Sequence, residues 1–252
     1  MLKRLKEEAA EFKLLLSSMP AITVVIFVLS VVSMNLLANK SIETHTQYLA
    51  LDCGIIVSWA SFLTMDVITK HYGPKAATEI SIVAVLVNLA LCLVFFVASK
   101  IPGVWGESYV EGSEGIINGA LDKTFGGTWY VLLGSTAAFL VSAVINNALN
   151  FAVGKAFKKK PDGVWAFILR TYVSTAVGQF ADNFVFALIV SRIFFGWSWV
   201  QCVTCAVTGM AVELLCEAAF APLGYLVCKR WRERGVGREY FEFKNAKKEA
   251  AK

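Results

Sequence analysis

Polar side chains able to bind a small molecule lie inside apolar segments that are long enough to cross a bilayer. The stretch 164–190 reads VWAFILRTYVSTAVGQFADNFVFALIV and contains Arg170, Gln179, Asp182 and Asn183. At about 100° per residue, its polar side chains share one half of a helix surface and its apolar side chains share the other. One face can contact lipid, whereas the other must contact protein, water or a ligand. A charged group in hydrocarbon costs at least about 2.5 kcal/mol, so this cluster requires a functional or structural reason.

Further carboxylates lie deep in other apolar segments. Glu213 and Glu217 lie near the middle of the last apolar run, and Asp66 lies near the end of the second. Asp182, Glu213 and Glu217 are too short to reach the interface, so each must be paired, protonated or in contact with a wet cavity. A carboxylate accepts two parallel N–H bonds, and an Asn or Gln amide both donates and accepts. Such a pocket suits a small polar solute.

Extension of a side chain to the membrane interface and catalysis are the two alternatives to a binding role. Arg170 lies close to one end of its segment, so its guanidinium can also extend to the membrane interface. Catalysis is disfavoured because His45 and His71, the two histidines, lie at segment edges on opposite sides, and no HExxH motif occurs. We therefore expect no enzyme, no catalytic residue, no cofactor and no metal.

Composition excludes a soluble domain. The chain has 252 residues, of which 57% are hydrophobic and 17% are charged, whereas soluble domains carry about 25% charged residues. Its mean hydropathy of +0.60 is typical of a polytopic membrane protein. The net charge of +5 does not indicate nucleic-acid binding, because the basic residues lie at the edges of the apolar segments.

The apolar pattern predicts an all-α bundle of six transmembrane helices. Each segment is long enough to cross about 30 Å of hydrocarbon at about 1.5 Å per residue. The expected spans are residues 20–38, 48–69, 78–98, 128–153, 164–190 and 197–228, within a transmembrane domain of residues 20–230. Residues 1–19 are expected to be an amphipathic cytoplasmic segment, and residues 231–252 a charged cytoplasmic tail.

The distribution of basic residues predicts the orientation. Of the 24 Lys and Arg residues, nineteen fall on one side of the expected bundle, four fall on the other, and Arg170 lies inside a span. Cytoplasmic loops carry the excess of Lys and Arg, so both termini are expected in the cytoplasm. An even number of spans satisfies that arrangement.

Four motifs, in their order and spacing, carry a resemblance to a known family. They are S-x-N at residues 33–35, D-x-x-T-x-x-Y-G at 66–73, R-x-x-x-S-T-x-x-x-Q-x-x-D at 170–182 and E-x-x-x-x-P-x-x-Y at 217–225. Together they resemble the queuosine-precursor transporter family, also called the vitamin uptake transporter family.

The resemblance implies a six-helix protein of the bacterial inner membrane. It implies uptake of 7-deazapurine precursors of queuosine, such as the cyano- and aminomethyl-deazaguanines, and an architecture similar to the substrate-binding subunits of energy-coupling-factor importers. A guanine-like base presents two parallel N–H donors, which suit a carboxylate. We expect the substrate-binding residues to be Asn35, Asp66, Thr69, Arg170, Ser174, Gln179, Asp182, Glu213 and Glu217.

Two positions depart from the family pattern. Lys70 stands where an acid is usual, and Glu213 stands where a Lys is usual. The two changes have opposite sign, so we hypothesise that Lys70 and Glu213 form an ion pair.

The leading interpretation is a transporter that imports a 7-deazaguanine-type base or a related purine-like solute. The alternative is a substrate-binding subunit of a vitamin importer that needs a separate ATPase module. The expected partners are the small-molecule substrate and the lipid bilayer, and no nucleic acid is expected. The sequence leaves open whether the protein forms a homo-oligomer or binds a coupling subunit. The energy source for transport also stays open.

Overall fold

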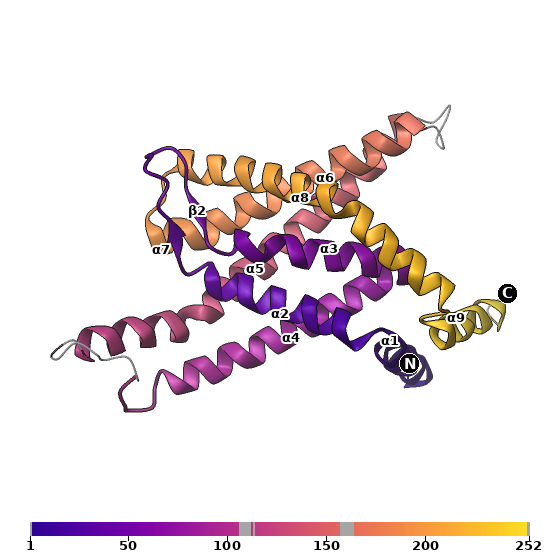
Figure 1. Cartoon of the computed structure of the whole chain (residues 1–252), viewed down its shortest axis with the longest axis horizontal. Helices are drawn as coiled ribbons and strands as arrows, with labels where there is room; N and C mark the ends of the chain where they lie inside the picture. Colours follow the sequence, from indigo (N-terminus) through magenta and orange to yellow (C-terminus); the bar gives the residue numbers. More distant parts are fainter. Residues whose placement is uncertain (1, 106–111, 113, 157–163, 251–252) are drawn as a thin grey trace.

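The computed structural model describes residues 2–105, 112, 114–156 and 164–250. Within these ranges, nearly all regular structure is helical (Figure 1), and the exception is a short antiparallel ribbon of β1 (Ser41–Ile42) and β2 (Leu51–Asp52). The helices are α1 (Leu2–Ser18), α2 (Ala21–Leu37), α3 (Ile55–Tyr72), α4 (Pro74–Ala98), α5 (Glu114–Ala156), α6 (Val164–Phe186), the π-helix η1 (Ala187–Ser191), α7 (Arg192–Phe195), α8 (Trp199–Glu233) and α9 (Arg238–Ala250).

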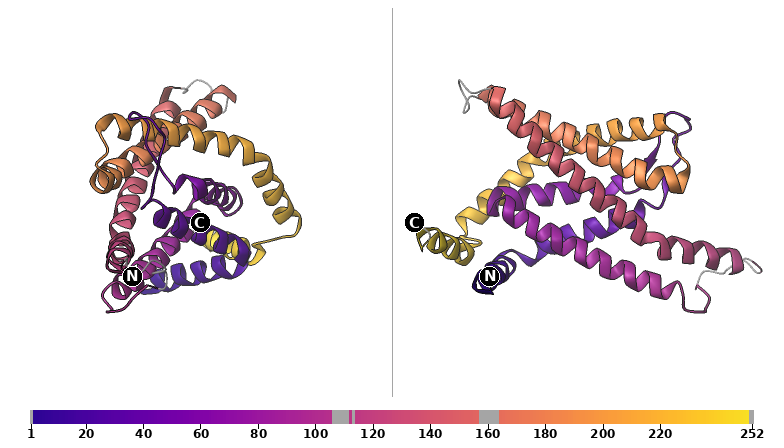
Figure 2. Two further views of the ribbon diagram at one scale, coloured as in Figure 1. Left: turned by 60° about the vertical axis from the view of Figure 1, so that its left-hand side comes forward. Right: turned by 180° about the vertical axis from the view of Figure 1, so that it is seen from behind.

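The long helices of the described chain close into a ring. Helix α2 packs against α3, α3 against α8, α8 against α6, and α6 against α5, which contacts α4. Helix α4 returns to α2 and α3 and completes the ring. Figure 2 shows α5 crossing the bundle from one end to the other, while α1 and α9 lie together at the end that carries both termini.

The ring is apolar on the outside and partly polar on the inside. Leu29, Leu93 and Leu215 are 59%, 63% and 70% exposed, whereas Asn35 and Glu213 are 3% and 5% exposed. This distribution is the reverse of that in a soluble protein, where large apolar residues are mostly buried. It fits helices that turn apolar side chains to lipid and satisfy their backbone hydrogen bonds internally.

Length and composition mark four of the described helices as able to cross a membrane. They are Pro74–Ala98, Gly115–Ser142, Thr175–Phe195 and Trp199–Glu233. A fifth span is counted if Lys6–Ser18 and Ala21–Leu37, whose axes are bent by 99° at the break between them, cross the membrane as one unit. Helix α3 does not qualify, because polar residues near its end lower its hydropathy. The chain is therefore an all-α multi-pass membrane protein, and the full count of six spans stays a prediction.

Several helices begin or end away from the expected positions. Helix α3 begins at Ile55, after the β1–β2 ribbon, rather than at residue 48. Helix α5 already begins at Glu114, before residue 128, since the polar segment that precedes the apolar run is helical too. The break between α3 and α4 lies where Gly73 and Pro74 predict it: Gly73 has φ 95°, and Pro74 starts α4, where its missing N–H costs nothing.

A π-helical turn extends α6 and packs closely against α5. The π-turn η1 changes the backbone hydrogen-bond pattern, and the Tyr130 hydroxyl donates to the Ile189 carbonyl at 2.8 Å. Gly134 of α5 faces the same turn, and a Cβ placed there would lie 2.2 Å from Val190 Cγ2. Close approach of the two helices therefore depends on a residue without a side chain.

Gly134→Ala is expected to lower the stability of the protein by about 1–3 kcal/mol, since the added methyl group must push α5 away from η1. The measurement is the thermal unfolding midpoint in detergent. Gly127→Ala is the matched control, because it lies in the same helix and has no heavy atom within 4 Å of the added Cβ. Equal midpoints for the two variants would contradict the close packing.

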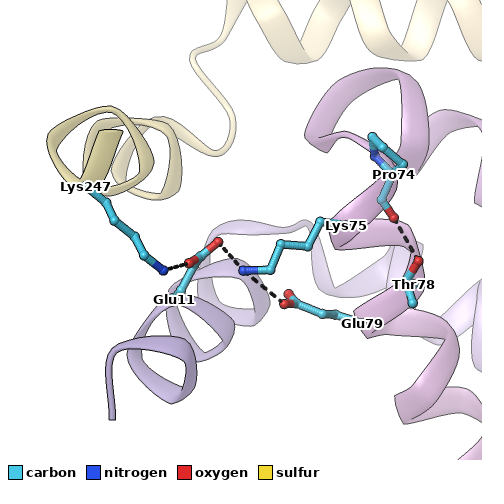
Figure 3. A network of polar contacts seen from close by, with 6 residues as sticks. All are labelled: Glu11, Pro74, Lys75, Thr78, Glu79 and Lys247. Atoms are coloured by element: carbon cyan, nitrogen blue, oxygen red, sulfur yellow. Dashed lines mark hydrogen bonds and ion pairs between the residues drawn. The ribbon is translucent and has the colours of Figure 1, made fainter. Parts of the chain in front are cut away.

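The two terminal helices are tied to the start of α4 by one carboxylate. Glu11 of α1 has a side chain that is 3% exposed, and its two oxygens accept from Lys75 and Lys247, each at 2.7 Å. Lys75 also lies 3.5 Å from Glu79. Figure 3 shows the carboxylate between the two ammonium groups, one from α4 and one from α9. We call this group, Glu11 with Lys75 and Lys247, the terminal clamp.

Aromatic side chains extend the terminal clamp to the end of α3. The Tyr72 hydroxyl donates to the Ser18 carbonyl at 2.9 Å, and the Tyr72 ring stacks on Phe241 with centroids 5.6 Å apart. His71 Nε2 lies 3.0 Å from the Val236 carbonyl. The corner between α3 and α4 is therefore held by α1 on one side and by α9 on the other.

Glu11→Gln is expected to loosen α9, because a neutral amide cannot accept charge-assisted hydrogen bonds from both ammonium groups. Amide hydrogen exchange over residues 238–250 should rise by roughly tenfold, as expected for a loss of about 1.4 kcal/mol in a local opening equilibrium. Glu7→Gln, on an exposed part of α1, is the control and should leave exchange unchanged. Unchanged exchange in Glu11→Gln would show that the clamp does not hold α9.

Candidate functional site

Three adjacent cavities lie inside the helix ring. Cavity A, of about 80 Å³, lies between α2, β2, α3, α5, α6 and α8. Its polar lining residues are Asn35, Asp52, Ser58, Ser135, Asp182, Asn183 and Glu213. Cavity A is on the side of the ribbon and the start of α3, away from the terminal clamp.

Cavities B and C are larger. Cavity B, of about 360 Å³, lies between α3, α5, α6 and α8 and is lined by Trp59 and by the polar residues Asp66, Thr69, Ser142, Thr175, Gln179, Glu213 and Glu217. Cavity C, of about 220 Å³, is mostly apolar and lies between α2, α3, α4, α5 and α6. Asn35, Gln179 and Asp182 are among its polar lining residues.

Shared residues make these cavities neighbouring compartments of one interior. Phe62 of α3 lines all three cavities. Glu213 lines both A and B, and Gln179 lines both B and C. Phe62 is therefore a lining residue that all three cavities have in common.

The structure brings together the predicted site residues whose side chains it describes. Asn35 and Asp182 line cavities A and C, Gln179 lines B and C, and Glu213 lines A and B. Asp66, Thr69 and Glu217 line cavity B. The side chains of Arg170 and Ser174 lie outside the described residues. The substrate-binding role of all nine residues stays a prediction.

Glu213 is held in place by a neighbouring amide. The Asn183 Nδ2 group donates to Glu213 Oε2 at 3.1 Å and to the Gln179 carbonyl at 2.9 Å. Gly209 of α8 gives Asn183 the space to do so, because a Cβ there would lie 2.6 Å from Asn183 Oδ1. A carboxylate positioned by an amide in this way keeps its second oxygen available to a ligand.

Several polar groups around the cavities have no partner in the described part of the chain. Gln179 Oε1 is buried without a hydrogen bond. The side chains of Asn35, Asp182 and Glu217 also form no hydrogen bond or ion pair with any described residue. Buried polar groups are normally satisfied by protein or water, so unpaired groups that converge on a cavity indicate a place for a polar ligand.

The hypothesis of a Lys70–Glu213 ion pair is wrong. Lys70 Nζ lies 2.5 Å from Asp66 Oδ2, one helical turn away on α3. Glu213 instead accepts from Asn183. The i,i+4 spacing brings Lys70 and Asp66 together on one face of α3, so the lysine neutralises the nearer carboxylate.

The cavity residues that were not among the predicted site residues include Asn183, Asp52 and Phe62. Asn183 was visible as part of the polar face of 164–190, but its contact with Glu213 depends on Gly209 of another helix. Asp52 precedes α3 and lies outside the candidate membrane spans. Burial raises the pKa of Asp52 to about 6, although a hydrogen bond from the Gly54 amide opposes the shift. Phe62 carries no chemical signal in the sequence, because its role depends only on where the cavities meet.

The geometry defines a class of protein. A ring of helices that is apolar toward lipid and encloses polar cavities is the architecture of a membrane protein that handles a polar solute. A model of the family described as putative vitamin uptake transporters matches residues 52–227. The match covers more than half of the chain, so the chain belongs to the vitamin uptake transporter family. No curated protein and no solved structure matches the chain.

Proposed function

We propose that this protein imports 7-deazaguanine-type precursors of queuosine, or a closely related purine-like solute. The proposal places six spans in the bacterial inner membrane, with both termini in the cytoplasm. Family membership supports transport rather than catalysis. The base class is supported by the motif resemblance and by the chemistry of cavity B.

The observation that carries the proposal is the combination of unpaired polar groups and space in cavity B. Glu217 forms no hydrogen bond or ion pair with a described residue, Gln179 Oε1 is unpaired, and both line a cavity of about 360 Å³. A guanine-like base presents two parallel N–H donors that a carboxylate such as Glu217 can accept. Trp59, stacked on Phe220 with centroids 4.6 Å apart, supplies a rigid aromatic surface at the same cavity.

A complementation experiment tests the proposal. The protein is expressed in a bacterium that can neither make nor import queuosine precursors, and tRNA queuosine is measured at low external deazaguanine. Rescue is expected with the natural chain and not with Glu217→Ala. Glu233→Ala, an exposed position of the same helix, is the control and should rescue fully. Absence of rescue by any deazaguanine or queuine, with the protein present in the membrane, would overturn the proposal.

The alternative is a substrate-binding subunit that depends on a separate ATPase module. Purified protein in vesicles, with no other protein added, separates the two. Uptake of labelled deazaguanine by these vesicles supports an autonomous transporter. Binding without uptake, followed by uptake when a coupling module is added, supports the subunit.

Collapse of a proton gradient across the same vesicles tests whether protons drive the transport.

A further inference from the structure

A series of carboxyl groups runs through the helix ring from the β1–β2 ribbon toward the terminal clamp. Cavity A, at the ribbon end, is lined by Asp52, Asp182 and Glu213. Cavity B, nearer the terminal clamp, is lined by Glu213 again and by Asp66 and Glu217. Glu213 therefore belongs to both compartments, and each compartment holds further acidic groups. Acidic residues arranged in this way inside a membrane protein are typical of a proton pathway.

Cavity A has no described cation to balance its acidic groups. Lys, Arg and His are absent from its described lining, α2, α3 and α5 contribute no charged side chain to it, and Cys205 of α8 is its other titratable group. The Asp52 carboxylate accepts from the Gly54 amide at 2.8 Å, and Glu213 accepts from Asn183 at 3.1 Å. These neutral donors leave the negative charges in place. Binding of a proton to one carboxyl group relieves the repulsion between them.

The groups that line cavity B with Glu213 do not balance its charge either. Lys70 of α3 pairs with Asp66, at 2.5 Å. Glu217, one turn from Glu213 on α8, forms no hydrogen bond or ion pair with a described residue. Glu213 therefore lies between acidic groups on both sides.

Unpaired amides indicate that both compartments hold polar space. Asn35 of α2 is 3% exposed, lines cavity A, and its side chain forms no hydrogen bond with a described residue. Gln179 lines cavity B, and its Oε1 atom is buried without a partner. Buried amides are normally satisfied by protein, water or a ligand. Cavity A, at about 80 Å³, has room for several water molecules at about 10–15 Å³ each, and a proton can pass between carboxyl groups through such water.

We propose that import is coupled to the inward movement of a proton, which passes from Asp52 through Asp182 to Glu213 and leaves through cavity B. This inference rests on the proposed function and its orientation, and it names the energy source. The proton comes from external water, binds a carboxylate oxygen of Glu213, and passes to water in cavity B, which regenerates the carboxylate.

Glu213 can link the proton to the substrate because it lines the cavity proposed to hold the base. A guanine-like base presents two N–H donors, which Glu217 can accept, and beside them a carbonyl oxygen that accepts a hydrogen bond. A protonated Glu213 has an O–H donor for this oxygen, whereas an ionised Glu213 offers acceptors only. Proton binding and base binding therefore favour each other, and each raises the affinity for the other.

The test is accumulation of labelled 7-cyano-7-deazaguanine, a neutral base, by vesicles that contain the purified full chain. With the membrane potential clamped and the outside about one pH unit more acidic, one coupled proton should raise the internal concentration to about ten times the external one. Without an imposed gradient, a pH-sensitive dye inside the vesicles should report acidification when the base is added. A sodium gradient in place of the proton gradient should give no accumulation.

The steady-state accumulation ratio separates coupling from binding, because weaker binding slows the approach to this ratio without changing it. Asp182→Asn, which keeps the shape of the side chain but cannot carry a proton, should give a ratio close to one. Asp182→Glu retains a carboxyl group and should keep accumulation. Glu233→Gln, at an exposed position of α8, is the control and should keep the natural ratio.

Exchange of internal for external base needs no gradient, so it tests import separately from coupling. Exchange without accumulation in the natural protein, accumulation driven by sodium instead, or an unchanged ratio in Asp182→Asn would overturn proton coupling and leave the proposed import intact. Binding without exchange would overturn the coupling and support the ATPase-dependent subunit, whereas absence of both would overturn the proposed function as well. If Asp182→Asn does not fold, judged by its thermal midpoint, Asp52→Asn decides, and its ratio should also fall close to one.

Discussion

Glu213→Ala is expected to abolish uptake and to weaken substrate binding on the order of 100-fold or more. Glu213 is the acidic residue that lines both cavity A and cavity B in the described chain. Loss of one partner from a buried, hydrogen-bonded charge contact costs about 2–5 kcal/mol. The substitution also leaves the Asn183 amide without its carboxylate acceptor. The measurements are uptake of labelled deazaguanine by cells and the dissociation constant of the purified protein.

Two further variants show whether this loss is specific. Glu213→Gln keeps the volume and one acceptor oxygen, so it should fall between the natural protein and Glu213→Ala. Glu233→Ala removes an exposed carboxylate from the same helix and should have no effect on uptake. Uptake by Glu213→Ala within about threefold of the natural protein, a difference of under 1 kcal/mol, would exclude Glu213 from the site.

Phe62→Ala is expected to convert controlled uptake into leakage. Phe62 lines cavities A, B and C, so we expect that loss of its ring joins them into one space. Vesicles loaded with substrate should lose it rapidly, and uptake should no longer saturate. Stability should also fall by about 2–4 kcal/mol, because loss of the half-buried ring removes its apolar contacts and enlarges the space inside the bundle.

The control for Phe62 is a phenylalanine on the outer surface. Phe96 of α4 is 43% exposed, so Phe96→Ala removes the same atoms without changing a described cavity. Phe62→Trp adds volume at the wall and should slow both uptake and efflux. Equal leakage from vesicles that carry Phe62→Ala and Phe96→Ala would show that the ring does not separate the compartments.

Much of the polar interior could be predicted from spacing within single helices. The helical period places Gln179 and Asp182 on one face, and the length of the apolar segment places them away from water. That reasoning extends to Glu213 and Glu217, whose short side chains cannot reach the interface. Membership of the vitamin uptake transporter family, expected from the motifs, was confirmed.

Features that depend on contacts between helices could not be predicted in the same way. Asn183 reaches Glu213 only because Gly209 on another helix leaves room for it. Asp52 joins cavity A because a two-residue ribbon sets the start of α3. The hypothesis of a Lys70–Glu213 ion pair failed because it rested only on the opposite charges of the two residues. Lys70 instead pairs with Asp66, which lies one turn away on the same helix.

The terminal clamp also has a consequence for biosynthesis. Glu11 belongs to the first described helix, Lys75 to α4, and Lys247 to α9. The Glu11 carboxylate is therefore synthesised long before the Lys247 ammonium group that pairs with it. During translation, Glu11 can pair with Lys75 once α4 has been made, but the contact with Lys247 must wait for α9. The corner beyond Asp66 and Thr69, at one end of cavity B, therefore reaches its final form only after the whole helix ring has been synthesised.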